Sequence, residues 1–217
     1  MERDYLLKII YLESVDSTQI YLKNLLKNKA IDLPYAVSSE YQTFGRGSRD
    51  NLWLGTYGNL YLSFAIKLSE IPNDLKIESA SIYYAYLLKM TLDEFGSKTW
   101  IKWPNDFYIK SLKVGGMITN VVNDTLVCGV GLNLVNSPND YVKLDISIDK
   151  KKLIEKYFTN IEKKMLWKQV FSKYRLEFSL NKKFSTHYNN DKISMENAFL
   201  NDDGSITINN ERIYSLR

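Results

Sequence analysis

Two short stretches of this 217-residue sequence concentrate residue types that bind anions. In Phe44-Gly45-Arg46-Gly47-Ser48-Arg49, glycines let the backbone approach a ligand closely, and arginines can grip a phosphate or a carboxylate. In Lys113-Val114-Gly115-Gly116, a compact positive charge precedes two glycines. Both have ordinary structural interpretations too. The first also fits a solvated turn or a fragment of an RNA-binding tract, and the second a surface lysine beside a β-bulge.

Four further stretches carry polar or aromatic side chains. Trp53, close to the arginines, could stack on a purine or anchor its segment to the core. Lys102-Trp103-Pro104-Asn105-Asp106 is either a turn that faces a ligand or an ordinary turn. Gly129-Val130-Gly131-Leu132-Asn133 marks a close backbone approach or a bulge, and Asn133 could read the edge of a base. Asp16-Ser17-Thr18-Gln19 caps a helix and could also bind a polar ligand.

The composition excludes several classes of protein. An apolar content of 45% and a charged content of 25% are ordinary for a globular domain. A single cysteine, Cys128, excludes a disulfide framework and a cysteine-based zinc site, and a single histidine, His187, weakens any metal or histidine-base argument. The formal charge of +4 favours an acidic ligand slightly without indicating nucleic acid. With no signal peptide and no apolar stretch of about 18 residues, we expect a soluble, cytoplasmic protein.

Hydrophobic periodicity indicates the elements that must position these stretches. We expect a helix over about 17–28 and another over about 73–95, with residues 43–59 forming a long loop of the kind that is functional or mobile in compact domains. The expected strands are Leu6–Leu12, Tyr35–Ser39, Leu60–Ile66, Trp100–Trp103, Phe107–Ile109, Gly116–Val122 and Leu126–Leu134. Leu60–Ile66 is apolar enough to be buried on both faces.

The last part of the chain changes character. A helical block is expected from about Lys151 to Leu180, and short strands follow around an Asp202-Asp203-Gly204 turn. The fold class is therefore α+β, a mixed sheet backed by helices with a small all-β barrel at the C-terminus. We expect a catalytic or binding domain over residues 1–180 and the small domain over 181–217.

Each stretch is weak evidence alone, but their order and spacing resemble the biotin–protein ligases. The matching series is Asp16–Thr18, Glu40–Gly47, Trp53, Lys102–Asp106, Lys113–Gly116 and Gly129–Asn133. Lys-Trp-Pro-Asn-Asp followed by a lysine seven residues beyond is the most specific element. The tail from Ile213 to Arg217 resembles the end of the family's SH3-like domain, so the resemblance implies a class II synthetase-like ligase fold with that domain.

The resemblance implies a two-step reaction. Biotin's carboxylate attacks the α-phosphate of ATP, and a lysine of the biotin carboxyl carrier protein of acetyl-CoA carboxylase then takes the biotin from the adenylate. It implies catalytic roles for Lys113, Arg46 and Asp106. Biotin contacts are implied for Ser17, Thr18, Gln19, Gln42, Gly45, Arg46, Gly47, Ser48, Lys113 and Gly116. ATP contacts are implied for Arg46, Arg49, Trp53, Lys102, Asn105, Lys113 and Asn133.

The resemblance also implies Mg²⁺ bound with ATP. Asn105 and Asp106 would lie near the metal, the phosphates or the incoming lysine, and these alternatives stay open. The family includes monomers and homodimers, so both oligomeric states are open too.

Three departures from the family pattern matter. The family loop commonly reads Gly-Arg-Gly-Arg-x-x-Arg-x-Trp, whereas this chain has Ser48 and Asn51 at the later arginine positions and Arg49 as an extra cation. We hypothesise that the adenylate escapes more readily than from arginine-bearing relatives; equal escape from the wild type and Ser48→Arg would contradict this. Gln19 stands where the family often has Asn. Asp16–Thr18 lies too near the first residue for the helix-turn-helix domain of repressor-type relatives, so we expect no operator binding.

Three rival functions remain. A lipoate or octanoate ligase would carry an arginine-glycine-glycine-glycine run with a following histidine, which this sequence lacks. A non-catalytic module that binds biotin or a nucleotide would not need Lys113 and Arg46, and both are present. An RNA-binding protein is disfavoured because the glycine-arginine stretch is single and has no interleaved aromatic residues.

Overall fold

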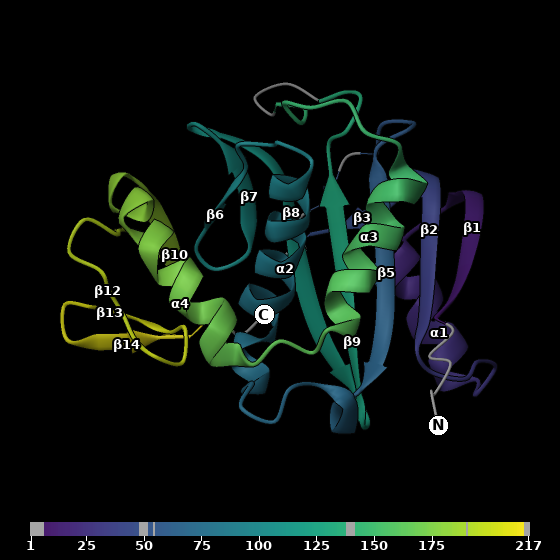
Figure 1. Cartoon of the computed structure of the whole chain (residues 1–217), viewed down its shortest axis with the longest axis horizontal. Coiled ribbons are helices and arrows are strands. Elements are labelled where there is room, and N and C mark those ends of the chain that lie inside the picture. The colour runs from purple at the N-terminus through teal and green to yellow at the C-terminus, as the bar shows by residue number, and fades with distance from the viewer. Residues whose placement is uncertain (1–6, 48–51, 54, 138–141, 190, 215–217) are drawn as a thin grey trace. The chain divides into compact units, whose positions relative to one another are not determined.

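The computed structural model describes residues 7–47, 52–53, 55–137, 142–189 and 191–214 (Figure 1). The chain divides into two compact units. Unit 1 comprises residues 1–71, 112–147 and 217, and unit 2 comprises residues 72–111 and 148–216. This division follows compactness alone, so the boundary expected near residue 180 stays a prediction.

Unit 1 is built on a sheet whose described strands lie in the order β1 (Lys8–Val15), β2 (Tyr35–Gln42), β5 (Leu60–Lys67), β9 (Thr125–Leu132) and β8 (Leu112–Val122). The first pair is parallel and the other pairs are antiparallel, which makes the sheet mixed, as expected. All of β5 except its last residue is buried, as its unbroken apolar run predicts. A short 3-10 helix, η2 (Leu68–Glu70), follows β5.

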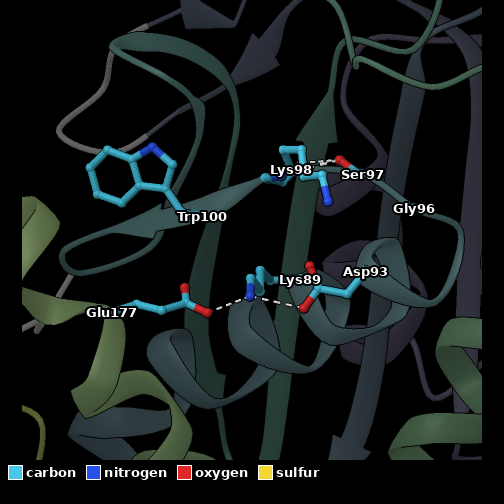
Figure 2. Close-up of a pocket in the computed structure, with 8 residues that line it drawn as sticks. Lys89, Asp93, Gly96, Ser97, Lys98, Trp100 and Glu177 are labelled. Atoms are coloured by element: carbon cyan, nitrogen blue, oxygen red, sulfur yellow. Dashed lines mark hydrogen bonds and ion pairs between the residues drawn. The ribbon is translucent and has the colours of Figure 1, made fainter.

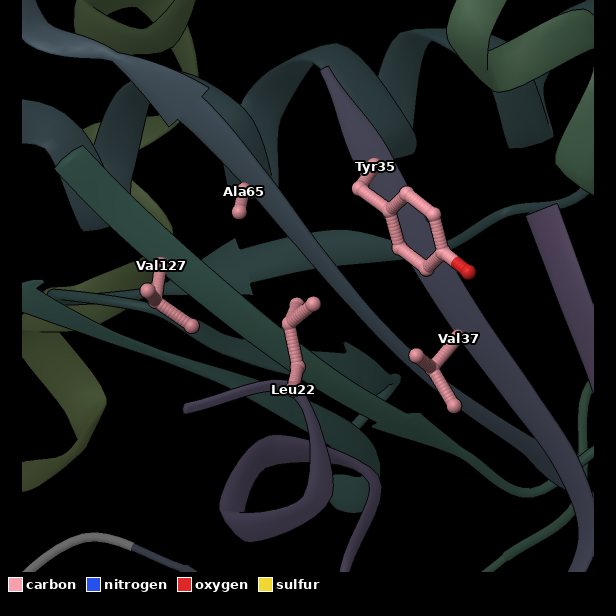
Figure 3. Close-up of a cluster of buried hydrophobic side chains, with 5 residues drawn as sticks. All are labelled: Leu22, Tyr35, Val37, Ala65 and Val127. Atoms are coloured by element: carbon pink, nitrogen blue, oxygen red, sulfur yellow. The ribbon is translucent and has the colours of Figure 1, made fainter. Parts of the chain in front are cut away.

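Helix α1 (Thr18–Lys27) packs against this sheet. Ser17 is its N-cap, and the Ser17 side chain accepts a hydrogen bond from the Ile20 N–H. Leu22 is fully buried against the sheet residues Tyr35, Val37, Ala65 and Val127 (Figure 3). The helix predicted over 17–28 is therefore confirmed, and burial of its apolar side holds it in place.

The expectation that residues 43–59 form a loop without elements is wrong in part. Gly45–Arg46 (β3) and Leu52–Trp53 (β4) pair as a short antiparallel hairpin. A Cβ on Gly45 would lie 2.6 Å from the Trp53 carbonyl oxygen, so the pairing requires glycine at position 45. Strands of two residues carry no detectable periodicity, which is why the sequence did not reveal them.

Unit 2 contains the longer helices. A 3-10 turn, η3 (Ile77–Ser79), leads into α2 (Ala80–Glu94), and the hairpin β6 (Trp100–Lys102) and β7 (Asp106–Ile109) follows. The helix expected from residue 73 thus begins seven residues later. The helical block expected near 151–180 is two helices, α3 (Lys150–Glu162) and α4 (Trp167–Glu177), followed by η4 (Phe178–Lys183).

The C-terminal strands confirm the expected change of character. The hairpin of β10 (Ser185–Tyr188) and β11 (Asp191–Ser194) is followed by the three-stranded antiparallel sheet of β12 (Phe199–Leu200), β13 (Ile206–Ile208) and β14 (Glu211–Ile213). The α+β fold class is therefore confirmed. Of the helices in the described ranges, none has the length and hydrophobicity needed to cross a bilayer.

Candidate functional site

Along the sheet face that packs against α1, the side chains of β2 and β9 become smaller toward one end. Because residues two apart on a strand share a face, the register defines successive rows across β2, β5 and β9. These rows are Tyr35–Ala65–Val127, then Val37–Ser63–Gly129, then Ser39–Tyr61–Gly131. The series runs from Tyr35 to Ser39 on β2 and from Val127 to Gly131 on β9, whereas on β5 it ends at the buried Tyr61.

Side chains from two other elements lie against the two glycines of β9. A Cβ on Gly129 would lie 3.3 Å from the Gln19 Nε2 atom, and a Cβ on Gly131 would lie 2.7 Å from the Trp53 Cε2 atom. The Trp53 ring therefore packs directly on the backbone at Gly131, where a larger residue would displace it. Gly116 on β8 is the register partner of Gly131, so a second predicted glycine stands in the same row.

The N-terminal end of α1 holds a buried hydroxyl–amide network, here called the α1 network, of Thr18, Gln42 and Ser63. The Thr18 backbone N–H donates to Gln42 Oε1 at 2.8 Å, and the Thr18 hydroxyl lies 3.1 Å from the same atom. The Thr18 Oγ1 and Ser63 Oγ atoms are 2.8 Å apart. The three residues are 3%, 7% and 0% exposed. The structure thus brings Thr18 and Gln42 together, as the sequence predicted, and adds Ser63.

Sequence reasoning missed Ser63, but its signal was present. Ser63 is the one polar residue inside the apolar run Leu60–Ile66 apart from the Tyr61 hydroxyl. A polar side chain in a fully buried strand must find a hydrogen-bond partner or cost stability. The isolated serine therefore pointed to a partner on another element.

Gln19 bonds within the protein. Its Nε2 atom donates to Asn120 Oδ1 on β8 at 3.1 Å, and Lys23 Nζ donates to the same oxygen at 2.8 Å. Burial, together with the nearby charge of Lys27, lowers the pKa of Lys23. These bonds fasten α1 to β8 beside the α1 network, so Gln19 is a structural support in this structure, and its predicted contact with a ligand stays a prediction.

The β3–β4 hairpin is held at its entry. Thr43 Oγ1 donates to Asp16 Oδ1 at 2.7 Å, and the Phe44 N–H donates to the Asp16 carbonyl at 2.8 Å. Gly45 is buried, while the Arg46 side chain is exposed. Gly47 follows it directly. The predicted site residues Ser48 and Arg49, and the neighbouring Asn51, lie outside the described residues.

Lys113 and Trp53, which are far apart in sequence, meet in the structure. Lys113 Nζ lies 6.0 Å from the centre of the Trp53 ring, within the range of a cation–π contact. The Lys113 carbonyl accepts from the Val142 N–H at 3.0 Å, which ties the start of β8 to a neighbouring loop. A positive charge and an aromatic face therefore stand together, a pairing suited to a phosphate beside a base.

Asn133 lies inside a network that shapes the loop after β9. Its Oδ1 atom accepts from Asn59 Nδ2 at 3.3 Å, and its Nδ2 atom donates to the Val142 carbonyl at 3.3 Å. Asn59 Oδ1 in turn accepts from three successive N–H groups of the loop: Leu134 at 3.0 Å, Val135 at 3.1 Å and Asn136 at 3.3 Å. Asn59 is fully buried and organises this loop, a role the sequence did not reveal.

The predicted residues Lys102, Asn105 and Asp106 lie on the β6–β7 turn of unit 2. Lys102 and Asp106 are register partners, Asn105 is buried, and Lys102 Nζ lies 5.8 Å from the centre of the Tyr108 ring. Trp103 anchors the turn: its N–H donates to Asn181 Oδ1 at 2.7 Å and its Nε1 donates to the Gly204 carbonyl at 2.8 Å.

The remaining candidates fit structural roles. Cys128 is fully buried, and burial raises the pKa of its thiol well above the ordinary value, which agrees with the expected core position. His187 is exposed on β10. In the described ranges, no three histidine, cysteine, aspartate or glutamate side chains gather as a metal-binding group.

Unit 2 has a pocket of about 340 Å³ beside the end of α2 (Figure 2). Lys89 Nζ lies between the carboxylates of Asp93, at 2.8 Å, and Glu177. The Tyr86 hydroxyl also donates to Glu177, at 2.9 Å. We call these four residues the Lys89 cluster. Its one cation bridges two carboxylates within the protein and joins α2 to α4.

Comparison with known proteins identifies, over more than half of the chain, the family that the sequence motifs resemble. The model of the biotin/lipoate A/B protein ligase family matches residues 11–136. The bifunctional ligase/repressor BirA of Escherichia coli (strain K12) is 31% identical over 134 residues. That match covers 58% of this chain and 40% of BirA, so the chain spans less than half the length of this relative.

Solved structures cover nearly the whole chain. Biotin acetyl coenzyme A carboxylase synthetase from Helicobacter pylori, crystallised with bound biotinylated ATP, is 36% identical, with a TM-score of 0.92. That similarity covers 96% of this chain and 99% of the other. The biotin protein ligase of Aquifex aeolicus in complex with biotin and ATP is 22% identical, with a TM-score of 0.78 over 97% of this chain and 96% of that one, which shows the shared fold.

Proposed function

The chain belongs to the biotin/lipoate A/B protein ligase family, and from this premise we propose that it is an ATP-dependent biotin–protein ligase. It forms biotinyl-5′-AMP and transfers the biotin to one lysine of a biotin carboxyl carrier protein. The likeness to the synthetase from Helicobacter pylori, which extends over nearly both chains, supports biotin as the acid.

The observation that carries the proposal is the α1 network. A cyclic urea presents N–H donors and a carbonyl acceptor, and a buried site must match both. Thr18 Oγ1 and the Gln42 amide supply an acceptor and a donor within one buried cluster. Ser17, at the helix cap, is 2% exposed and lies next to them in the chain. Lipoate's dithiolane ring has no such groups and would leave these atoms unmatched.

The first step joins two anions, so cations must offset their repulsion. An oxygen of the biotin carboxylate attacks the α-phosphorus of ATP, and the bond to the bridging oxygen breaks to release pyrophosphate. Lys113 places its positive charge beside the carboxylate and the α-phosphate, and Arg46 with the backbone of Gly45 and Gly47 covers them. The contact of Lys113 with Trp53 supports this assignment by setting the charge beside an aromatic face for the adenine.

The second step forms the amide. The neutral amine of the carrier lysine attacks the acyl carbon of the adenylate, AMP leaves, and the amine loses a proton. Asp106 is our candidate to orient that amine or the phosphates, with Asn105 beside it. Mg²⁺ bound with ATP would screen phosphate charge, and Asn105 and Asp106 are the residues proposed to lie near it.

The proposal extends to partners and location. The name of the synthetase from Helicobacter pylori points to a subunit of acetyl-CoA carboxylase as the carrier. A chain whose single cysteine is a buried free thiol suits a reducing compartment, and we therefore place the reaction in the cytoplasm.

Intact-mass spectrometry of an apo carrier domain tests the proposal. The domain is incubated with the protein, MgATP and either biotin or lipoate. We expect a mass increase of one biotin that requires ATP and is lost in Lys113→Ala. A lipoate adduct instead would identify an attachment enzyme of the sister type. No adduct with either acid, from folded protein and a competent carrier, would favour a non-catalytic binding module.

A further inference from the structure

We propose that Ser63 is a positioning residue for acid recognition: it fixes the direction of the hydrogen bonds in the α1 network, so that Thr18 presents an acceptor and Gln42 presents donors to the ligand. This inference rests on the proposed biotin ligase function. Ser63 lies in a strand that the sequence singled out only for its apolar character, and it acts through Thr18.

The orientation of the Gln42 amide follows from the Thr18 backbone. A backbone N–H can only donate, and it lies 2.8 Å from one end of the Gln42 side-chain amide. That end must therefore be the oxygen, Oε1, and the other end must be the nitrogen, Nε2.

The direction of the two hydroxyl bonds then follows from counting protons. Oε1 only accepts, so at 3.1 Å the Thr18 hydroxyl must donate to it. A hydroxyl has one proton, and that of Thr18 is now used. In the contact of 2.8 Å between the hydroxyls, Ser63 must therefore be the donor. The order of donation is Ser63 to Thr18 to Gln42.

This order leaves defined groups for a ligand. Thr18 Oγ1 has a second lone pair, and the Gln42 Nε2 atom carries two N–H donors. The Nε2 atom faces the β3–β4 hairpin, because a Cβ on Gly45 would lie 2.8 Å from it. A ring with an N–H beside a carbonyl satisfies both groups. Without the Ser63 donor, the Thr18 hydroxyl keeps only its bond to Gln42 Oε1, so the direction in which it presents a lone pair to the ligand's N–H is no longer fixed.

The sheet provides a matched control. Ser38 on β2 is 1% exposed, like Ser63 in a buried strand, but its hydroxyl has no hydrogen-bond partner within the described part of the chain. Ser63→Ala and Ser38→Ala remove the same atom from the same sheet. Only the first breaks the order of donation.

The test measures KM and kcat for biotin in the carrier-domain assay, and biotin affinity by calorimetry. We expect Ser63→Ala to raise the KM for biotin about tenfold, the scale of one hydrogen bond, with kcat and the KM for ATP unchanged. Ser38→Ala should leave all three unchanged. Ser63→Cys, which keeps a weak donor of similar shape, should raise the KM less and serves if the alanine variant does not fold.

A double-mutant cycle makes the test specific. In a Thr18→Val background, Ser63→Ala should add little, because the partner of Ser63 is gone. A full effect of Ser63→Ala in that background, or equal effects of the two serine variants on biotin KM, would overturn the inference while leaving the proposed function intact. A wild-type protein that neither binds nor transfers biotin would overturn the proposed function and this inference together.

Discussion

The α1 network of unit 1 and the Lys89 cluster of unit 2 are both polar clusters that include buried residues, and they use their hydrogen bonds differently. The α1 network is neutral, and after its internal bonds Gln42 Nε2 and one lone pair of Thr18 stay available. The Lys89 cluster is charged, and Lys89 spends its donors on Asp93 and Glu177. A site that binds a ligand leaves some donors and acceptors without partners inside the protein. In a structural ion pair, the charged groups bond to each other instead. Substitutions in each region should therefore differ in kind as well as in size.

The largest effect is expected at the cation of unit 1. Lys113→Ala should lower kcat for biotin transfer about a thousandfold, because it removes a preorganised charge from the reacting anions. The melting temperature should stay within about 2 °C of the wild type, measured by scanning calorimetry. Lys67→Ala, at the exposed end of β5, is the matched control and should leave kcat unchanged. An equal loss of kcat in both variants would mean that kcat depends on the net charge of the protein and not on the position of the Lys113 charge.

The second effect should fall on stability alone. Lys89→Met leaves the carboxylates of Asp93 and Glu177 facing each other without a cation between them. We expect the free energy of unfolding to fall by about 2 kcal/mol, less than for a fully buried pair because both carboxylates are partly exposed. Urea titration measures this, and kcat at low temperature should not change. A loss of biotin transfer without a loss of stability would contradict the contrast between the two regions, because it would mean that the Lys89 cluster contacts a ligand.

A smaller effect on catalysis is expected from substitution of Gly131, the β9 glycine that lies under the Trp53 ring. Gly131→Ala would place a Cβ 2.7 Å from the Trp53 ring and push the ring off the sheet. We expect the KM for ATP to rise about tenfold, with little change in the KM for biotin. Gly129→Ala lies on the same face of the same strand, but its Cβ would press on Gln19 Nε2, at 3.3 Å, instead of on the Trp53 ring. It should leave the KM for ATP unchanged, and an equal rise in both variants would argue against the role of Trp53.

Local patterns predicted local structure well. The cap at Asp16–Thr18 located α1, and the run Leu60–Ile66 identified β5 as a strand buried on both faces. The β3–β4 hairpin escaped detection because each strand has two residues. The helical block expected near 151–180 is divided after Glu162, where the sequence has no proline or glycine to indicate a break.

The resemblance assigned Thr18 and Gln42 to one ligand, and the structure bonds the two residues to each other. Their contact with a ligand stays a prediction. Ser63 and Asn59 were not identified, because their partners lie far away in sequence: Ser63 acts on Thr18, and Asn59 binds the loop from Leu134 to Asn136. Trp103 shows the same limit, since its anchors Asn181 and Gly204 come from the last forty residues. Such partners become visible only when the topology is known.

The smallest expected effect separates the two regions by pH. Burial disfavours the charge on Lys89, but the carboxylates of Asp93 and Glu177 outweigh it and raise the pKa of Lys89 above its ordinary value. A raised pKa contributes stability that is fully present below the unfolded lysine's pKa of about 10.4 and is lost as pH rises through the folded value. The stability difference between the wild type and Lys89→Met should therefore be constant from pH 7 to pH 9 and shrink above about pH 10.5. Urea titrations at each pH measure it. The effect of Ser63→Ala on biotin affinity should be constant from pH 6 to pH 9, because none of the three side chains in the α1 network titrates there. If the stability difference between the wild type and Lys89→Met grew as the pH rose, its pH dependence would be opposite to the expected one, and the ion pair could not be its cause.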